Sequence, residues 1–486
     1  MLCDEGEGHG VALGQLHGLN RTRLVELMGD QEGVVLLQGG KLQHRYDTDK
    51  EELFRQESHF HYLFGVKEAG CWGAIRLADR KAVLFIPRLH PDYAIWDGRI
   101  KPPSEFAEEY ELDQAFFVDE IKRVILEEWK EKVVHILSGI NSDSKRSFAE
   151  AELESVLGDS VCELVVRRDV LLLRMAEARL IKNELEIQIL RYVNLISSNA
   201  HRYVMRRVKP GMKEYQLESL FLHYCSYRMH AREVPYHCIC CTGENGAVLH
   251  YGGDQCPLTA CIEDGDMCLL DMGSEHHCYV SDITCSFPAN GKFSPIQKEV
   301  YLAVYRAQRA VEAAICPGVE WIDMHKLAER VLIENLREFG FLNKEYSAEE
   351  LFENRISAYF MPHGLGHLMG LDVHDVGGYP PGRERVPLPS LKYVRVNRTL
   401  QEGMVLTNEP GVYFIRNLIG PALKDPSVSK FFNVEKISSV LASRFGGVRL
   451  EDDVVVTKTG CETLTKVPRS IEDVEAEMKL PAPLIE

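Results

Sequence analysis

Residues 267–287 read MCLLDMGSEHHCYVSDITCSF, in which two apolar runs flank the polar residues 274–277. This pattern predicts a β-hairpin. With His276 and His277 in the turn, Asp271 lies directly across from Asp282 on one face. Opposed side chains have Cβ atoms about 4.5–5.5 Å apart, and two carboxylates that close among apolar residues repel each other and resist desolvation. The hairpin therefore predicts a cation between the two acids, the alternative being two solvated loop aspartates.

A second polar segment, residues 361–378, reads MPHGLGHLMGLDVHDVGG. His363 and His367 are four residues apart, which on a helix would form a zinc pair, but Pro362 and the glycines disfavour a helix. We expect a loop in which glycines let the backbone approach a ligand. His374 is expected in a short strand, LDVHDV. The alternative is a group of structural histidines.

Two further acids occupy unusual places. Glu409 lies between an apolar run and PGVYF, and Glu451 lies in GGVRLEDDVVVT, which predicts one strand with Arg449 and Glu451 on the same face. Oxygen ligands favour Mn, Mg or Ca, and an added imidazole suits Mn, Co, Fe or Zn. Four carboxylates balance two divalent cations, which can share a bridging hydroxide at a separation of about 3.5–4 Å. The alternative for Glu451 is a solvent-facing strand residue.

The rest of the chain divides into two regions of different pattern. Residues 1–175 predict an α/β domain. In residues 176–486 the pattern changes, and glycines, prolines and histidines become dense from residue 357, which indicates a site built on loops and strand ends. The expected helices span about 177–205, 213–229 and 295–314, and the expected strands span 33–37, 82–86, 133–137, 235–241 and 267–271.

Composition excludes several classes of function. The 486 residues include 56 Lys and Arg against 73 Asp and Glu, a net charge of −17. A negative field repels phosphates, so nucleic acid and anionic membranes are not expected partners.

The sequence shows no signal peptide and no apolar run long enough to span a bilayer, which predicts a cytoplasmic protein. Its 14 cysteines are scattered, and the YHCICC stretch predicts a buried strand rather than a zinc site.

The motifs together resemble those of the pita-bread metallopeptidases, and most of all the eukaryotic-type Xaa-Pro dipeptidases, or prolidases. They are LLDMG, SDITCSFPANGKF, MPHGLGHLMGLDVHDVGGYP, LTNEPGVYF and GGVRLEDDVVVT. Residues 53–66 and 85–89 resemble the amino-terminal domain of those enzymes. The resemblance implies an α/β amino-terminal domain, an α+β pita-bread catalytic domain with two pseudo-symmetric halves, and a homodimer.

The resemblance also implies roles for individual residues. The implied metal ligands are Asp271, Asp282, His367, Glu409 and Glu451, of which Asp282 and Glu451 would bridge two ions. The implied catalytic residues are His250, His363, His374 and Glu409, and the implied substrate contacts are His250, His374, Arg395, Arg449, Trp96 and Tyr236. One departure is Asn408, which stands where the family has an apolar residue. Alternation places its side chain opposite the ligand face, so it concerns local packing.

The expected reaction is hydrolysis of Xaa-Pro dipeptides by a hydroxide that bridges two divalent ions, with Mn²⁺ as the expected metal. The X–Pro amide has no N–H, so a dedicated site is reasonable. The close alternative is aminopeptidase P, which acts on longer peptides with proline second. A methionine aminopeptidase is a weaker alternative, because it would not explain the amino-terminal domain. A non-enzymatic binding protein with this fold is a further alternative, and the presence of all five implied ligands argues against it. A comparison of dipeptide with tripeptide substrates separates the first two.

Overall fold

The computed structural model describes residues 13–481 and divides them into two compact units. The amino-terminal unit ends at Glu186, and the carboxy-terminal unit begins at Ile187. The boundary expected from the sequence, 175/176, falls inside helix α6 (Leu171–Leu180).

The amino-terminal unit is built on a six-stranded mixed sheet of order β4-β3-β2-β1-β5-β6. The three middle strands β1, β2 and β3 pair antiparallel, and the outer pairings are parallel. The apolar run of β1 is buried because helices and loops cover the sheet. Its strands are β1 (Val34–Gln38), β2 (Trp72–Arg76), β3 (Lys81–Ile86), β4 (Gln114–Phe117), β5 (Val133–His135) and β6 (Val165–Arg167). Its α-helices are α1 (Leu13–Met28), α2 (Ser58–Phe64), α3 (Tyr93–Trp96), α4 (Pro103–Glu109), α5 (Leu153–Leu157) and α6.

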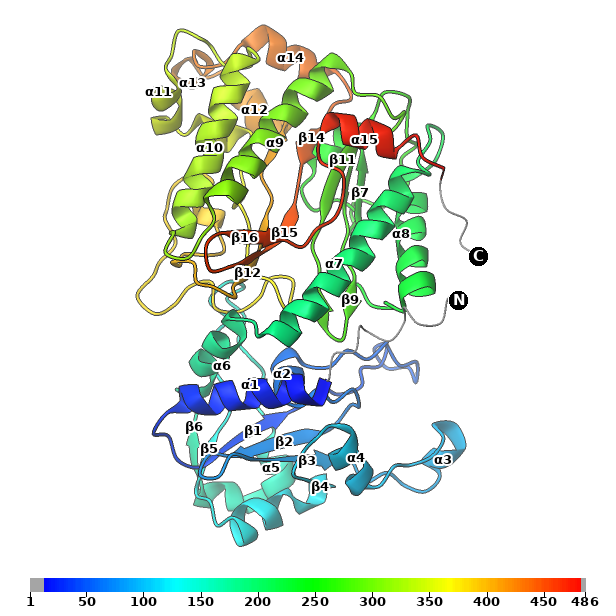
Figure 1. Ribbon diagram of the computed structural model, residues 1–486, viewed down its shortest axis with the longest axis vertical. Helices are drawn as coiled ribbons and strands as arrows, with labels where there is room; N and C mark the ends of the chain where they lie inside the picture. Colours follow the sequence, from blue (N-terminus) through cyan, green and yellow to red (C-terminus); the bar gives the residue numbers. More distant parts are fainter. Residues whose placement is uncertain (1–12, 482–486) are drawn as a thin grey trace. The chain divides into compact units, whose positions relative to one another are not determined.

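The carboxy-terminal unit repeats one order of elements twice. Two helices, α7 and α8, precede the three-stranded sheet β11-β8-β7, and two further helices, α9 and α10, precede the three-stranded sheet β12-β15-β16. Helix α8 packs on β7, and α9 packs on β12, β13 and β14 (Figure 1). The unit therefore has the two similar halves that were predicted.

The elements of this unit have the following bounds. The strands are β7 (Ile239–Thr242), β8 (Met267–Asp271), β9 (Glu275–His276), β10 (Tyr279–Val280), β11 (Thr284–Pro288), β12 (Val405–Asn408), β13 (Gly411–Tyr413), β14 (Gly447–Arg449), β15 (Asp452–Val456) and β16 (Cys461–Thr463). The α-helices are α7 (Glu184–Met205), α8 (Glu214–Met229), α9 (Pro295–Ala314), α10 (Trp321–Glu338), α11 (Ala348–Glu353), α12 (Arg416–Ala422), α13 (Pro426–Ser429), α14 (Val434–Ala442) and α15 (Ile471–Glu477).

Helix α9 has the bounds that its sequence predicts. The Ser294 side chain accepts a hydrogen bond from the Gln297 amide, Gln297 reaches back to the Ser294 amide, and Pro295 occupies the first turn. The single helix predicted over 177–205 is wrong, because Asn183 starts a new one. Its Oδ1 accepts from the Leu185 amide at 2.9 Å, and Glu186 accepts from the Asn183 amide at 2.8 Å. This capping box separates α6 from α7.

The hairpin of the first half forms two residues out of the predicted register. The turn lies at His277–Cys278, whose φ values of 49° and 63° suit a two-residue turn that follows the twist of the strands. Asp271 consequently pairs with Thr284, and Asp282 lies two residues before Thr284, just outside β11. A shift of two residues keeps the side chains on the same face. Asp271 and Asp282 are diagonal neighbours rather than directly opposed.

Two other predicted strands differ in the structure. Residues 371–376, LDVHDV, form turns instead of a strand, since the Asp375 amide donates back to the Leu368 carbonyl at 2.9 Å. GGVRLEDDVVVT forms two strands, because the chain leaves β13 after Arg449 and joins β12 at Asp452. Glu451 lies in the short gap between the two strands.

Within residues 13–481, every helix is too short or too polar to cross a lipid bilayer. The thirteen cysteines in this part of the chain are all free thiols. Cys240 and Cys241 are buried in β7, which confirms the prediction of a buried strand there.

Candidate metal and substrate site

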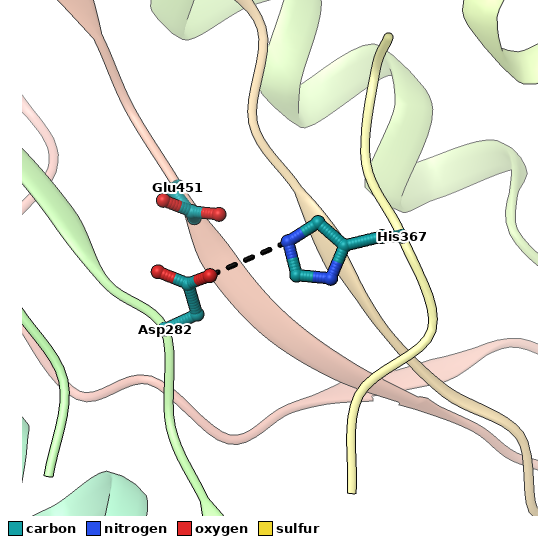
Figure 2. Close-up of side chains that lie close together, drawn as sticks. All are labelled: Asp282, His367 and Glu451. Atoms are coloured by element: carbon teal, nitrogen blue, oxygen red, sulfur yellow. Dashed lines mark ion pairs between the residues drawn. The ribbon is translucent and has the colours of Figure 1, made fainter. Parts of the chain in front are cut away.

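Three side chains from distant segments meet at the centre of the carboxy-terminal unit. Asp282 precedes β11, His367 lies in the glycine-rich loop 361–370, and Glu451 lies between β14 and β15. Each offers one ligand atom, and the three atoms lie within 4.8 Å of one another (Figure 2). All three residues are buried. The first half of the unit therefore supplies one acid and the second half supplies the other acid and the imidazole.

The orientation of His367 leaves one ring nitrogen directed at the acids. Its Nδ1 lies 3.1 Å from the Leu368 carbonyl oxygen, which can only accept a proton, so Nε2 carries the lone pair. Nε2 lies 3.3 Å from Asp282 Oδ2 and 3.5 Å from Glu409 Oε1. A metal-binding histidine is oriented in this way by its other nitrogen.

The backbone around His367 is held against strand β12. Its amide donates to Thr407 Oγ1 at 3.1 Å, and the Thr407 hydroxyl in turn donates to Glu409 Oε1 at 3.2 Å. A Cβ atom at Gly366 would lie 2.1 Å from the Thr407 carbonyl oxygen. The glycine is therefore required for the loop to reach the strand.

Two groups hold Asp282. The Tyr236 hydroxyl donates to Asp282 Oδ1 at 2.5 Å, and the Asp282 amide donates to Asp453 Oδ2 at 2.9 Å. The first contact leaves Oδ2 facing His367. Tyr236, which was predicted as a substrate contact, is thus in direct contact with a candidate metal ligand.

Arg449 is buried and uses each of its three nitrogens within the protein. Nη2 donates to Asp271 Oδ2 at 2.6 Å, Nε donates to Thr284 Oγ1 at 2.9 Å, and Nη1 donates to the Tyr413 hydroxyl at 2.9 Å. The Thr284 hydroxyl then donates to Glu451 Oε2 at 2.6 Å. Arg449 therefore orients Asp271 directly and Glu451 through one hydroxyl group.

The acids of the cluster resist ionisation. Burial, followed by the charge of neighbouring carboxylates, raises the pKa of Asp282 and Glu451 well above the usual range. Burial raises the pKa of Glu409 to about 7 against the attraction of His367. Asp271 Oδ1 is buried and accepts no hydrogen bond from residues 13–481. The cluster places several carboxylate oxygens and one imidazole nitrogen close together, with too little positive charge nearby to neutralise the acids. Such a set of ligand atoms is suited to divalent cations.

The remaining histidines surround the cluster. His363 Nδ1 lies 2.7 Å from the Gly364 carbonyl oxygen, so its Nε2 accepts from the Tyr413 hydroxyl at 3.0 Å. Burial, and then the charge of Arg449, lowers the pKa of His363 to about 3, so the ring is neutral. The His374 ring meets the His367 ring edge to face, with centroids 4.5 Å apart.

Arg395 lies within electrostatic range of two of these rings. Loss of solvation lowers the pKa of His250, with smaller contributions from the charges of Arg449 and Arg395. Loss of solvation also lowers the pKa of His374, with contributions from His367 and Arg395. His250, His374 and Arg395 therefore lie within electrostatic range of one another.

Two other residues named from the sequence lie elsewhere. Trp96 ends helix α3 of the amino-terminal unit, and 83% of its surface is exposed. Asn408 is buried behind the ligand face, where its Nδ2 donates to the Gln308 carbonyl of α9 at 3.0 Å. The prediction that Asn408 concerns packing is confirmed.

Sequence reasoning missed the residues that hold the ligands. Thr284 and Thr407 each lie two positions from a predicted ligand, so alternation already placed their hydroxyls on the ligand face. Tyr413 follows Glu409 in the GVYF stretch but carries no such signal. Asp453 contacts Asp282 from 171 residues away in the chain, and no local pattern indicates that contact.

Comparisons with known proteins match both parts of the chain. A model of metallopeptidase family M24 matches residues 188–458, and a model described as the aminopeptidase P N-terminal domain matches residues 17–136. The chain is 49% identical to an Xaa-Pro dipeptidase of Homo sapiens over 95% of this chain and 93% of that protein. It is 37% identical to a probable Xaa-Pro aminopeptidase of Pyrenophora tritici-repentis over 92% of each chain. The aminopeptidase PepP structure from Pseudomonas aeruginosa is similar with a TM-score of 0.77 and 32% identity, covering 96% of this chain and 98% of that chain.

The two-half catalytic unit and its buried cluster of carboxylates and imidazole define a metallopeptidase. The chain belongs to metallopeptidase family M24. The predicted fold, an α/β amino-terminal domain followed by a pita-bread catalytic domain, is confirmed.

Proposed function

We propose that the protein is an Xaa-Pro dipeptidase, which hydrolyses dipeptides whose second residue is proline. The observation that carries the proposal is the buried cluster of Asp282, His367 and Glu451 with Glu409 beside it. The relatives support the choice of substrate, because identity is 49% to the human Xaa-Pro dipeptidase and 37% to the fungal Xaa-Pro aminopeptidase.

The proposed cofactor is a pair of divalent cations, with Mn²⁺ as the expected metal. Asp271, Asp282, His367, Glu409 and Glu451 would hold the pair. When bound, such ions activate a water molecule and polarise the scissile carbonyl group. Two divalent cations would balance the charge of the four carboxylates, and burial disfavours the ionisation of two of them, Asp282 and Glu451, without such cations.

The protein's own groups are assigned as follows. Glu409 would carry a proton to the proline nitrogen, which agrees with its raised pKa and its position at the edge of the cluster. His250 and His374 are neutral at pH 7, because their pKa values are lowered, and they would donate N–H groups to the oxygen that gains charge in the transition state. His363 stays within the Tyr413 contact and would stiffen the loop that carries His367.

Arg395 is proposed to recognise the free carboxylate of the dipeptide. A planar guanidinium can make two parallel bonds to a carboxylate but not to an amide, so this residue would select dipeptides over longer peptides. Arg449 and Tyr236 are proposed to position metal ligands, since their polar atoms contact Asp271 and Asp282. This differs from the substrate contacts predicted from the sequence.

Assembly and compartment complete the proposal. Helix α3 exposes Tyr93, Ile95 and Trp96, with 73% and 83% of the last two accessible, and this apolar surface supports a homodimer in which Trp96 is covered. The thirteen free thiols among the described residues support a reducing compartment such as the cytoplasm.

The experiment that tests the function compares three substrates in the Mn²⁺-loaded enzyme: Gly-Pro, Gly-Pro amide and Gly-Pro-Gly. We expect Gly-Pro to be hydrolysed with the highest kcat/KM and the Asp282→Asn variant to be inactive. Preference for Gly-Pro-Gly would instead assign an aminopeptidase P activity. Absence of hydrolysis at full metal occupancy would leave a binding protein on this fold.

A further inference from the structure

We infer that His325 is a positioning residue that locks the loop carrying the metal-binding histidine to the segment carrying Arg395. His325 lies in helix α10 and is completely buried. It contacts neither the carboxylate cluster nor any group assigned above to substrate. The inference rests on the proposed function in one respect, which is the pairing of Arg395 with the dipeptide carboxylate.

The hydrogen bonds of the ring have a fixed direction. The Leu365 amide donates to His325 Nδ1 at 3.1 Å, so Nδ1 is unprotonated and Nε2 carries the hydrogen. Nε2 lies 3.0 Å from Ser390 Oγ and 3.5 Å from Glu329 Oε1. The Ser390 hydroxyl then donates to Glu329 Oε1 at 2.7 Å. The His325 ring therefore joins the loop that carries Leu365 to the segment that carries Ser390. The buried Glu329 carboxylate is the final acceptor of this series of hydrogen bonds.

The Leu365 side of this chain leads to the metal ligands. Leu365 lies between His363 and His367, and its carbonyl accepts from the Glu409 amide at 2.9 Å. The peptide groups on both sides of Leu365 are thus fixed, one by His325 and the other by a candidate ligand. A shift of the His325 ring would be transmitted to His367 and Glu409 together.

The Ser390 side leads to Arg395. Ser390 has φ 61° and ψ −53°, a backbone conformation that is unfavourable for a residue with a side chain. Arg355 Nη2 donates to Ser390 Oγ at 2.8 Å and to Glu329 Oε1 at 2.6 Å. These contacts hold the strained residue in place five positions before Arg395.

The two segments also touch directly. A Cβ atom at Gly364 would lie 2.8 Å from Val394 Cα and 2.9 Å from the Tyr393 carbonyl oxygen. The backbone beside His363 therefore packs on the backbone beside Arg395. His325 sets the register of this contact, and with it the distance between the metal ligands and the guanidinium that would receive the carboxylate.

The two hydrogen bonds of the His325 ring, one with the Leu365 amide and one with the Ser390 hydroxyl, can be removed separately. An Asn carboxamide reaches only the position of Nδ1, so His325→Asn keeps the contact with Leu365 and loses Ser390. A Gln carboxamide reaches the position of Nε2, so His325→Gln keeps Ser390 and loses Leu365. Ser390→Ala removes the same hydrogen bond as His325→Asn without changing the helix, and it also removes the contacts of the Ser390 hydroxyl with Arg355 and Glu329. Asn335→Ala is the matched control, because Asn335 is buried in the same helix and, within residues 13–481, its side chain forms hydrogen bonds only with Val331 and Arg306.

The Mn²⁺-loaded enzyme and its variants are assayed with Gly-Pro and Gly-Pro amide. We expect His325→Asn to raise KM for Gly-Pro about 5-fold, the effect of one hydrogen bond, with KM for the amide unchanged. Ser390→Ala removes three contacts and should raise KM for Gly-Pro at least as much, again with KM for the amide unchanged. We expect His325→Gln to lower kcat on both substrates and to weaken metal binding about 10-fold, as loss of a group that orients a ligand does. The Asn335→Ala enzyme should lose thermal stability alone.

Hydrogen–deuterium exchange supplies a readout that does not depend on activity. Amide protection in residues 361–370 should fall in His325→Gln and persist in His325→Asn, while residues 388–395 should show the reverse. If both variants lose protection in both segments and change kcat and KM alike, His325 is merely a core residue and the inference is wrong. If the wild type does not prefer Gly-Pro to its amide, the role of Arg395 fails, whereas opposite exchange patterns in the two variants would still support the positioning role.

Discussion

Replacement of Arg449 tests a residue whose role predicted from the sequence differs from its contacts in the structure. The sequence predicts that Arg449 binds substrate, whereas the structure directs its three nitrogens to Asp271, Thr284 and Tyr413. Arg449→Met removes a buried positive charge from a cluster of carboxylates. Loss of one partner of a buried ion pair costs about 3–5 kcal/mol.

At roughly 2–4 °C per kcal/mol for a large domain, this cost predicts a fall in Tm of about 6–20 °C in the metal-free protein at neutral pH. The fall should be smaller with Mn²⁺ bound, because the metal neutralises the same carboxylates. Arg449→Lys keeps the charge but cannot reach three acceptors at once. We expect it to retain much of the stability and to lose metal affinity about 10–100-fold.

Thermal unfolding with and without Mn²⁺, elemental analysis, and kcat and KM for Gly-Pro together decide the role. Thr284→Val is the matched control, since it cuts the hydroxyl link between Arg449 and Glu451 without removing charge. An Arg449→Lys enzyme with unchanged Tm and metal content but a raised KM for Gly-Pro alone would refute the positioning role and restore the substrate contact predicted from the sequence.

Three further predictions concern the metal, pH and substrate length. Asp282→Asn should lose bound metal and activity while keeping the fold, and two ions per subunit by elemental analysis would contradict this. The pKa of Glu409 is about 7, above its usual 4.5, so the contribution of Glu409 to stability is complete below about pH 4.5 and is lost as pH rises to about 7. The Tm of the metal-free protein should therefore fall between these pH values. The increase in Tm on adding Mn²⁺ should become larger over the same range, because the metal binds the deprotonated ligands. Arg395→Ala should weaken Gly-Pro hydrolysis by about 10–100-fold, the effect of a lost charge-assisted pair, and should spare the amide; equal losses on both substrates would argue against carboxylate recognition.

The sequence grouped Asp282, His367 and Glu451, which lie close together in the structure, but it predicted the local structure around them less well. The hairpin register was wrong by two residues, yet Asp271 and Asp282 remained on one face because a strand alternates with a period of two. His374 was expected in a strand, but the turns of residues 371–376 still bring its ring against His367. The glycines of the histidine loop correctly excluded a helix. The break between α6 and α7 was missed because the capping signal at Asn183 lies inside a continuous apolar pattern.

The residues that orient the ligands were beyond the reach of sequence pattern, for a physical reason. Arg449 and Asp271 are 178 residues apart, and Asp453 and Asp282 are 171 residues apart. Such contacts depend on how the two halves of the catalytic unit meet, and neither periodicity nor spacing records that. A ligand must have a particular chemistry at a particular strand end, so a motif can reveal it. A positioning group needs only to place a donor or acceptor at the correct distance, and many residues on many elements can do so. The contacts of Arg449 and His325 are accordingly where the structure adds most to the sequence, and where substitution separates metal binding from substrate recognition.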